Sequence, residues 1–292
     1  MYNFEHYHRA NDLADAIRLL AANPGSKLIS GGTDVLVSLH HGGEKYRSLV
    51  DIHALPELAG ISRLEDGSLR IGSGVTFTEL INSELIQKYC PAIGQAVANI
   101  AGPQIRNVAT IGGNICNGAT CGDSAPVSLV LDAQIEIANP QGRRFTPIDG
   151  FYTGPGKVRL APDEIAVAFY FKPENYMNVG TSSYKYAMRG AMDISTVSCA
   201  VACRLEQGKF TMMRMAFGVA APTPVLCPNA QAEALGKPAN EETFKKIGLA
   251  ALKDISPRSS WRASKEFRLQ IAKTIAERVV AQAAKTIQGQ TA

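Results

Sequence analysis

The sequence lacks any apolar run that approaches the roughly 20 residues needed to span a bilayer. Its first residues, Met-Tyr-Asn-Phe-Glu-His, lack the basic and apolar regions of a secretion signal. It also lacks a strong charge, since 30 basic and 26 acidic residues leave a net charge of +4 over 292 residues. We therefore expect a cytoplasmic protein with no membrane insertion and no nucleic-acid partner.

Metal-ligand spacing is absent as well. The six cysteines contain no Cys-x-x-Cys pair, and none of the five histidines lies at ligand spacing beside them. Cys116 and Cys121 are spaced like the first step of a plant-type iron–sulfur motif, but the third cysteine of that motif is missing. We expect free thiols and no metal site in this chain.

With 46% hydrophobic residues, the chain is long enough for two domains with separate cores. Apolar residues at helical spacing predict helices over residues 11–23, 77–100 with an interruption at Pro91, 124–131, 229–235, 241–253 and 264–286. Short apolar runs between turn residues predict strands over residues 27–30, 48–52, 60–63, 69–71, 134–138, 143–146, 164–171, 195–205 and 210–219. A polar linker is expected over residues 172–180. This order of elements predicts an α+β fold whose N-terminal domain ends near residue 175.

Two glycine-bearing loops are the candidate ligand site. Residues 110–124 concentrate glycines with short polar side chains, and Gly31-Gly32 lies between a predicted strand and a predicted helix. Glycine lets the main chain approach a ligand closely, so that successive N–H groups can converge on an anion. A glycine-rich turn between core elements is the alternative. Two such loops favour a dinucleotide, but not a Rossmann domain, because Phe77 replaces the third glycine after Gly72 and Gly74.

Three motifs carry a family resemblance: residues 27–34, residues 101–114 with Asp123, and residues 184–189 followed by Asp193-Ile194. They resemble the FAD-binding subunits of molybdenum hydroxylases, in particular those of bacterial xanthine dehydrogenases, over essentially the whole chain. The resemblance implies a vanillyl-alcohol-oxidase-type FAD domain over residues 1–175, with subdomains of about 1–55 and 56–175. A C-terminal domain of the carbon-monoxide-dehydrogenase flavoprotein kind would follow over residues 181–292.

The resemblance also implies which residues hold the cofactor. Two segments would enclose the FAD pyrophosphate: Leu28, Ile29, Ser30, Gly31, Gly32, Thr33, Asp34 and Val35 on one side, and Ala109, Thr110, Ile111, Gly112, Gly113 and Asn114 on the other. Asn117 and Asp123 would bond to cofactor hydroxyls, and Ile165 would pack on the cofactor. Tyr184 and Lys185 would approach it from the second domain, where a lysine could offset the negative charge of a reduced flavin. A solvated strand lysine is the alternative for Lys185.

Two positions depart from relatives of the family. Gly190-Ala-Met192 stands before Asp193, where eukaryotic xanthine-oxidising members carry acidic residues, which leaves the choice between NAD and oxygen as acceptor open. Thr33 stands where covalently flavinylated relatives of this fold can carry a histidine. Noncovalent FAD is the resulting expectation.

The resemblance implies an electron-transfer subunit. Iron–sulfur clusters of the 2Fe–2S type and a molybdenum–pterin centre would lie in two partner subunits, within a heterotrimer or its dimer, and FAD would pass electrons to NAD. No side chain of this chain would act as an acid or base on the organic substrate. A stand-alone FAD oxidoreductase with its own small substrate is the alternative, and a nucleotide-binding regulatory module without turnover is a third.

A basic segment precedes the last predicted helix and enters it. Residues 258–268 are basic and contain Trp261, the only tryptophan. We interpret this run as a helix entrance, capped by Ser264 or a neighbour, with Trp261 packed into the domain. A docking surface for a partner is the alternative.

Overall fold

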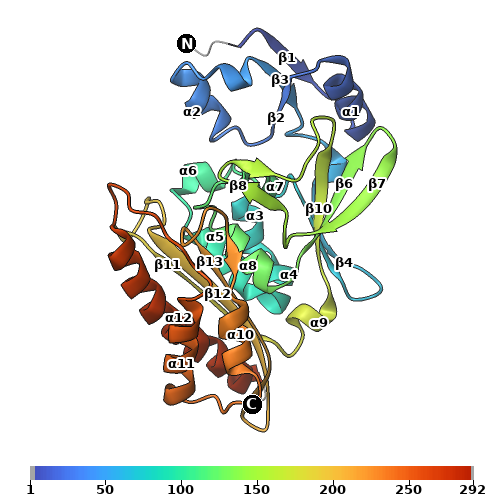
Figure 1. Ribbon diagram of the computed structural model, residues 1–292. Helices are drawn as coiled ribbons and strands as arrows, with labels where there is room; N and C mark the ends of the chain where they lie inside the picture. The colour runs from blue at the N-terminus through green and yellow to red at the C-terminus, as the bar shows by residue number, and fades with distance from the viewer. Residues whose placement is uncertain (1–3, 291–292) are drawn as a thin grey trace.

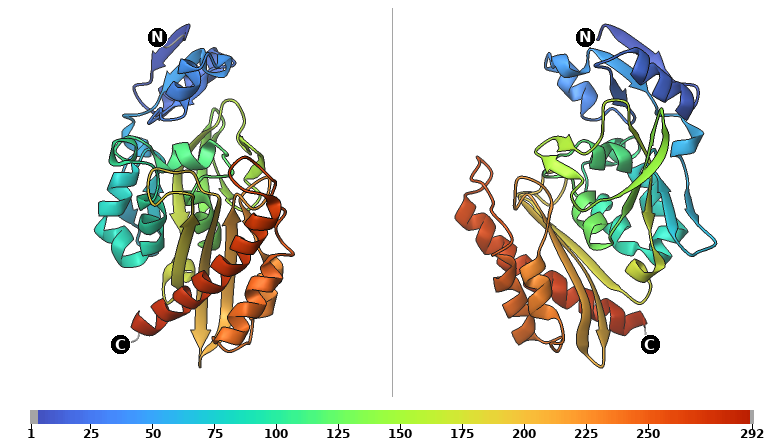
Figure 2. Two further views of the ribbon diagram at one scale, coloured as in Figure 1. Left: turned by 90° about the vertical axis from the view of Figure 1, so that its left-hand side faces the viewer. Right: turned by 45° about the vertical axis from the view of Figure 1, so that its right-hand side comes forward.

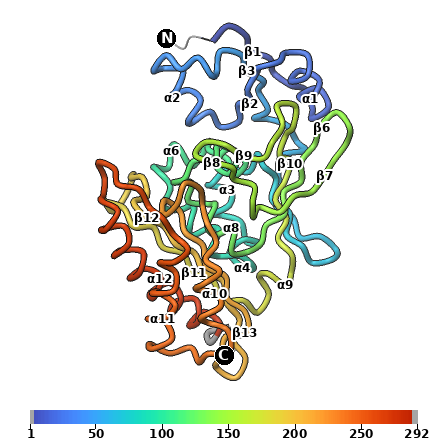
Figure 3. The backbone as a smooth tube through the Cα atoms, viewed as in Figure 1, coloured from blue at the N-terminus to red at the C-terminus, as the bar shows by residue number. Residues whose placement is uncertain are grey.

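The structure is a computed structural model that describes residues 4–290. Figure 1 shows a small N-terminal subdomain at one end, a larger subdomain in the middle and a sheet covered by helices at the other end. The two chain ends lie at opposite ends of the molecule, as the backbone trace in Figure 3 also shows. No helix in the described residues is long and apolar enough to cross a bilayer.

A three-stranded parallel sheet forms the N-terminal subdomain. It has the strand order β1-β3-β2. Asp12 caps the first helix by accepting a hydrogen bond from the Asp15 N–H at 2.7 Å, and Leu13, Ala16 and Leu20 of that helix are buried. Strand β1 was not predicted, because its side chains are mostly exposed and show no apolar alternation. The elements are β1 (His6–Arg9), α1 (Leu13–Ala22), β2 (Lys27–Ile29), α2 (Val35–His40), η1 (Glu44–Tyr46), β3 (Ser48–Asp51) and η2 (Pro56–Leu58).

The middle subdomain contains an antiparallel sheet with the strand order β4-β5-β10-β6-β7. Its strands are β4 (Ile61–Arg63), β5 (Leu69–Gly72), β6 (Gln134–Asn139), β7 (Gly142–Pro147) and β10 (Ile165–Phe171), and a small hairpin joins β8 (Tyr152–Gly154) to β9 (Lys157–Val158). Its helices are α3 (Phe77–Asn82), α4 (Glu84–Tyr89), α5 (Pro91–Ala98), α6 (Pro103–Arg106), α7 (Ile111–Cys116) and α8 (Ser124–Val130). Residues 77–100, predicted to break at Pro91 alone, also break at Ser83, which caps α4.

The segment predicted as a linker is instead packed. It contains α9 (Pro173–Tyr176), and Tyr176 is 5% exposed. The Tyr176 hydroxyl donates a hydrogen bond to the Gly67 carbonyl oxygen. Residues 172–177 therefore form part of the middle subdomain's surface rather than a free tether.

The C-terminal domain is an antiparallel sheet with the strand order β11-β12-β13-β14. The strands are β11 (Gly180–Tyr186), β12 (Val197–Glu206), β13 (Lys209–Gly218) and β14 (Val225–Leu226), and the helices are α10 (Pro228–Ala234), α11 (Glu241–Ala251) and α12 (Lys265–Gln290). Ser264 accepts a hydrogen bond from the Phe267 N–H at 3.2 Å, so the capping prediction is confirmed. Trp261 is 78% exposed, so the prediction that it packs into the domain was wrong.

The two faces of this sheet serve different cores. Helices α10, α11 and α12 cover one face, while α5 and α8 of the middle subdomain lie against the other (Figure 2). Alternate residues of β12 follow this division, because Val201 belongs to the core beneath the C-terminal helices while Ala200 and Ala202 belong to the core of the first domain. Small side chains on that face let α8 approach closely. The predicted α+β arrangement of two domains is confirmed.

Candidate functional site

The two glycine-bearing segments meet in the structure. Gly31 and Gly32 lie between β2 and α2, and Gly32 has a φ of +71°, which favours glycine. A Cβ atom at Gly31 would lie 1.9 Å from the carbonyl oxygen of Val108. The main chain of the first loop therefore lies directly against the residue before Ala109, and no side chain fits between them.

The second segment is partly helical, which differs from the predicted loop. Thr110 caps α7, since its hydroxyl oxygen accepts a hydrogen bond from the Gly113 N–H at 3.1 Å. The Thr110 hydroxyl also lies 3.3 Å from the Ser30 hydroxyl oxygen, to which it donates. Gly112 is buried, and a Cβ there would lie 2.6 Å from the Ser73 Cβ. The helix tolerates its glycines because one cap and one close contact fix the backbone.

Gly113 differs from these neighbours. It is exposed, and a Cβ at this position would meet only the Thr110 hydroxyl oxygen, at 3.0 Å. Within the described residues only the capping hydroxyl of Thr110 crowds this position, and the rest of the Gly113 surface is open. A free face beside two joined loops fits the close approach of a ligand.

Short polar side chains connect the two loops. The Asn117 amide nitrogen donates to the Asp34 carboxylate at 2.8 Å, and the Ser124 hydroxyl donates to the Asn114 side-chain oxygen at 2.6 Å. These bonds hold the end of α7 against both the first loop and α8. Within the described residues, the side-chain oxygen of Asn117 accepts no hydrogen bond and is available to a ligand.

A pocket opens at the first loop, and part of its lining was not predicted. Predicted residues Ile29, Ser30, Gly31 and Gly32 line it together with Leu36, Val108, Tyr7, Asp51 and His53. Asp51 accepts hydrogen bonds from the Tyr7 hydroxyl and, at 2.8 Å, from the His53 N–H. Asp51 pairs with Ile29 across parallel strands whose carboxyl ends meet here. That position at the end of a predicted strand was the available sequence signal.

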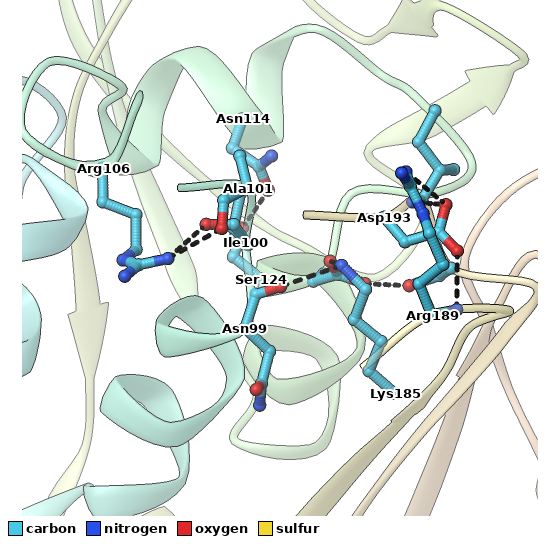
Figure 4. Close-up of polar contacts among 12 residues, drawn as sticks. Asn99, Ile100, Ala101, Arg106, Asn114, Ser124, Lys185, Arg189 and Asp193 are labelled. Carbon is cyan, nitrogen blue, oxygen red and sulfur yellow. Dashed lines mark hydrogen bonds and ion pairs between the residues drawn. The ribbon is translucent and has the colours of Figure 1, made fainter. Parts of the chain in front are cut away.

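Asp123 forms the centre of a buried network between the domains. Its carboxylate accepts hydrogen bonds from the Lys185 ammonium at 2.8 Å and from the Ser195 hydroxyl. Lys185 also donates to the Asn99 carbonyl oxygen at 3.0 Å, as Figure 4 shows. Burial raises the pKa of Asp123, while the nearby Lys185 charge opposes that rise. Ser195 was not predicted, and no sequence pattern pointed to it.

The structure places the remaining predicted residues differently. The Lys185 side chain is only 12% exposed, so the interpretation as a solvated strand lysine was wrong. Tyr184 is 49% exposed and lines a second pocket with Asn99 and Asp123. Ile165 is fully buried in the core cluster that contains Leu58, and it lines neither of these two pockets.

Two family models match the chain. One is described as the FAD binding domain in molybdopterin dehydrogenase and matches residues 2–171, and the other is described as the CO dehydrogenase flavoprotein C-terminal domain and matches residues 182–283. The xanthine dehydrogenase FAD-binding subunit of Escherichia coli O157:H7 is 57% identical over 283 residues, which are 97% of each chain. The carbon monoxide dehydrogenase medium chain of Hydrogenophaga pseudoflava is 29% identical over 94% of this chain and 95% of its own.

Two solved structures share this fold over nearly the whole chain. A carbon monoxide dehydrogenase chain from Hydrogenophaga pseudoflava has a TM-score of 0.93 at 28% identity, over 98% of this chain and 99% of that chain. A chain of quinoline 2-oxidoreductase from Pseudomonas putida 86 has a TM-score of 0.90 at 25% identity, over 97% of this chain and 98% of that chain.

Proposed function

Because the chain belongs to the FAD-binding subunits of the molybdenum hydroxylase family, as an oxidoreductase subunit of the xanthine or carbon monoxide dehydrogenase type, we propose that its flavin passes electrons from a partner to NAD. The electrons would come from 2Fe–2S clusters in one partner subunit. A molybdenum–pterin centre in another would hydroxylate a purine, within a heterotrimer or its dimer in the cytoplasm. The 57% identity to a xanthine dehydrogenase subunit supports the purine assignment.

The observation that carries the assignment of the cofactor site is Gly113, an exposed glycine with a free face beside two joined loops. We assign the pyrophosphate to the segments 28–35 and 109–114, where the Gly31 main chain touches Val108. Thr33 offers no imidazole for a covalent flavin bond, which supports noncovalent binding. The open glycine face and the polar side chains around it fit an anionic cofactor.

The hydroxyl contacts follow from the same geometry. Asn117 has a free carbonyl oxygen, and a carboxylate such as Asp123 can accept about four hydrogen bonds, of which Lys185 and Ser195 provide two. We assign both residues to hydroxyl groups of the cofactor. Ile165 would support it from the core, and exposed Tyr184 would approach it from the C-terminal domain.

Bound FAD would supply the two-electron chemistry that links one-electron clusters to a hydride acceptor. The work of the protein is then to hold the cofactor and to set the charge around it. The Lys185 ammonium lies in a buried site, where its positive charge acts more strongly than it would in water. No side chain is required as an acid or base on the organic substrate.

Reduction of the purified, FAD-loaded chain tests the proposal. NADH alone should bleach the flavin absorbance, because the acceptor site would belong to this chain and the reaction can run in reverse. Xanthine alone should leave the flavin oxidised, since the hydroxylation site would lie in a partner. Flavin reduction by xanthine in the isolated chain would instead favour a stand-alone oxidoreductase.

Substitution of Gly113 tests the cofactor site. Gly113→Val should abolish FAD retention on a desalting column, because a branched side chain would fill the free face. Gly113→Ala should weaken retention while changing the thermal stability of the apoprotein little, since the helix preference of alanine, about 1 kcal/mol over glycine, offsets its crowding of the Thr110 hydroxyl. Gly154→Val is a matched control, because a Cβ there meets only the end of Lys157, at 3.9 Å. A fully yellow Gly113→Val protein would contradict the assignment.

A further inference from the structure

The basic run over residues 258–268 has no carboxylate paired with its cations in the part of the chain that the structure describes. It carries the cations Arg258, Arg262, Lys265 and Arg268 but only one carboxylate, Glu266. No ion pair joins Glu266 to any of the three arginines in the part of the chain that the structure describes. The run therefore concentrates positive charge immediately before and within the first turn of α12.

Two of these arginines are short of acceptors. Arg268 is 3% exposed, and within residues 4–290 its guanidinium donates to two neutral oxygens alone, the Thr196 carbonyl and, at 2.8 Å, the Ser260 hydroxyl. The Nε atoms of Arg262 and Arg268 are buried and have no hydrogen-bond partner in the described residues. A buried cation without an anion is costly. Burial and, after it, the charges of Arg258 and Arg262 lower the pKa of Arg268, so an anion bound by these two more exposed arginines would relieve the repulsion within the cluster.

Trp261 stands beside the cluster as an exposed aromatic platform. It is 78% exposed, and the Arg262 guanidinium carbon lies 4.2 Å from the centre of its ring. The guanidinium covers one face of the indole, and the high exposure leaves the rest of the ring open. An aromatic ring beside unpaired guanidinium groups suits a ligand that combines a flat base with phosphates.

The cluster adjoins the Asp123 network. Thr196, which accepts from Arg268, follows Ser195, which donates to Asp123. The segment before α12 is held to the same region, because the Ser256 N–H donates to the Ala220 carbonyl oxygen at 2.8 Å. Figures 1 and 2 show this segment at the end of the C-terminal domain where β11 joins β12. A dinucleotide could therefore extend from the flavin region to the arginines.

We propose that Trp261, Arg258 and Arg262 bind the adenosine diphosphate portion of the dinucleotide that accepts electrons from the flavin. Adenine would stack on the open face of Trp261, and the two arginines would bond to the phosphates, which match the planar guanidinium fork. This proposal rests on the proposed function, because it assumes that NAD accepts the electrons of the flavin. An acidic segment of a partner subunit is the competing occupant.

Intrinsic fluorescence provides a direct test, because Trp261 is the only tryptophan. ADP-ribose, which lacks the nicotinamide and cannot react with the flavin, should quench the tryptophan emission of the FAD-loaded full chain in a saturable way. Arg262→Gln and Arg258→Gln should each weaken its affinity about tenfold, the effect of losing one charged hydrogen bond. Inorganic pyrophosphate should compete with ADP-ribose.

Arg278→Gln is the matched control, since Arg278 is exposed on the same helix about 15 Å beyond Arg268. It should leave ADP-ribose binding unchanged. Absence of saturable quenching, or equal affinity for adenosine and ADP-ribose, would overturn the proposal. Binding only to a purified acidic partner subunit would overturn it as well.

The dependence of flavin reduction on NADH concentration separates this site from the proposed function. The half-saturating NADH concentration should rise about tenfold in Trp261→Ala and recover in Trp261→Phe, which keeps a stacking ring. Unchanged half-saturation in Trp261→Ala, with normal reduction, would refute the site and leave NAD as the acceptor. If NADH fails to reduce the wild-type flavin, the acceptor assignment is wrong, and the ADP-ribose titration still decides whether a nucleotide binds here.

Discussion

At the scale of single residues, the Lys185–Asp123 pair joins the two domains with both charges largely out of water. Lys185→Met should destabilise the chain by about 3 kcal/mol at neutral pH, because it leaves the Asp123 carboxylate buried without its cation. Urea unfolding would measure the loss. Lys209→Met, at an exposed strand lysine in the same sheet, should change stability by less than about 0.5 kcal/mol.

The stability of Lys185→Met should depend on pH in one direction. Burial already raises the pKa of Asp123, and removal of Lys185 takes away the attraction that opposes the rise. The folded variant then binds a proton more tightly than the unfolded chain, so its stability falls as pH rises above the ordinary value of 3.8 toward neutrality. Lys185→Met should therefore be less damaging in acid than at neutral pH. An equal loss at both would contradict the pairing.

The positions of Ser195 and Trp261 could not be predicted from the sequence around them. Ser195 directly follows the Asp193-Ile194 motif, but its role depends on a carboxylate that lies 72 positions away. Trp261 was expected to pack because aromatic rings usually bury their area. Its exposure depends on the tertiary placement of the segment before α12, which local sequence does not encode.

At the scale of elements, a bidentate ion pair fastens β7 to the start of β10. Arg144 Nε and a terminal nitrogen donate to the two Glu164 carboxylate oxygens at 2.7 and 2.6 Å. The hydrogen bonds from Arg144 lower the pKa of Glu164 from 4.5 to about 2. The pair therefore stabilises the fold above pH 4.5, and that stabilisation is lost as pH falls toward about 2.

Arg144→Met should remove this contribution. We expect a loss of about 2 kcal/mol at neutral pH and a flatter decline of stability between pH 4.5 and about 2. Denaturant unfolding across this range would measure both effects. Arg18, whose side chain is 69% exposed in its pair with Asp15, provides the comparison, since Arg18→Met should cost about 0.5 kcal/mol or less. A parallel pH curve in Arg144→Met would argue against the ion pair.

Most elements could be predicted because their apolar periods are clear. The strands β12 and β13 and the helix α12 have long runs whose spacing matches one secondary structure. Helix α7 could not be predicted, because Gly112 and Gly113 disfavour a helix locally. It forms because Thr110 caps it and because Gly112 fits against Ser73. Edge strand β1 carried no apolar signal at all.

At the scale of the whole molecule, the C-terminal sheet is packed on both faces, so the two domains share a core. Ala202 is fully buried on the face that meets the first domain. Ala202→Leu should cost about 1 to 3 kcal/mol, because extra volume there forces α8 and the sheet apart. Thr211→Leu, at an exposed residue of β13, should be close to neutral.

The shared core also makes a prediction about cooperativity. Amide hydrogen exchange in β13 would report on the C-terminal domain, and exchange in β6 would report on the first domain. The two signals should change together during unfolding of the wild-type chain. If this sheet face couples the domains, Ala202→Leu should make the two domains unfold in separate transitions. A single transition at lower stability would show that other contacts couple them.

The contact between Gly31 and Val108 limits how substitutions can reshape the pocket at the first loop. At Gly31 the two loops meet main chain against main chain, with no room for a side chain between them. The distance between the two loops is therefore set by their backbones at this contact. Substitutions at Ser30, Thr33 or Asn117 can change the polarity of the walls without widening the cleft, whereas any side chain at position 31 would separate the loops themselves.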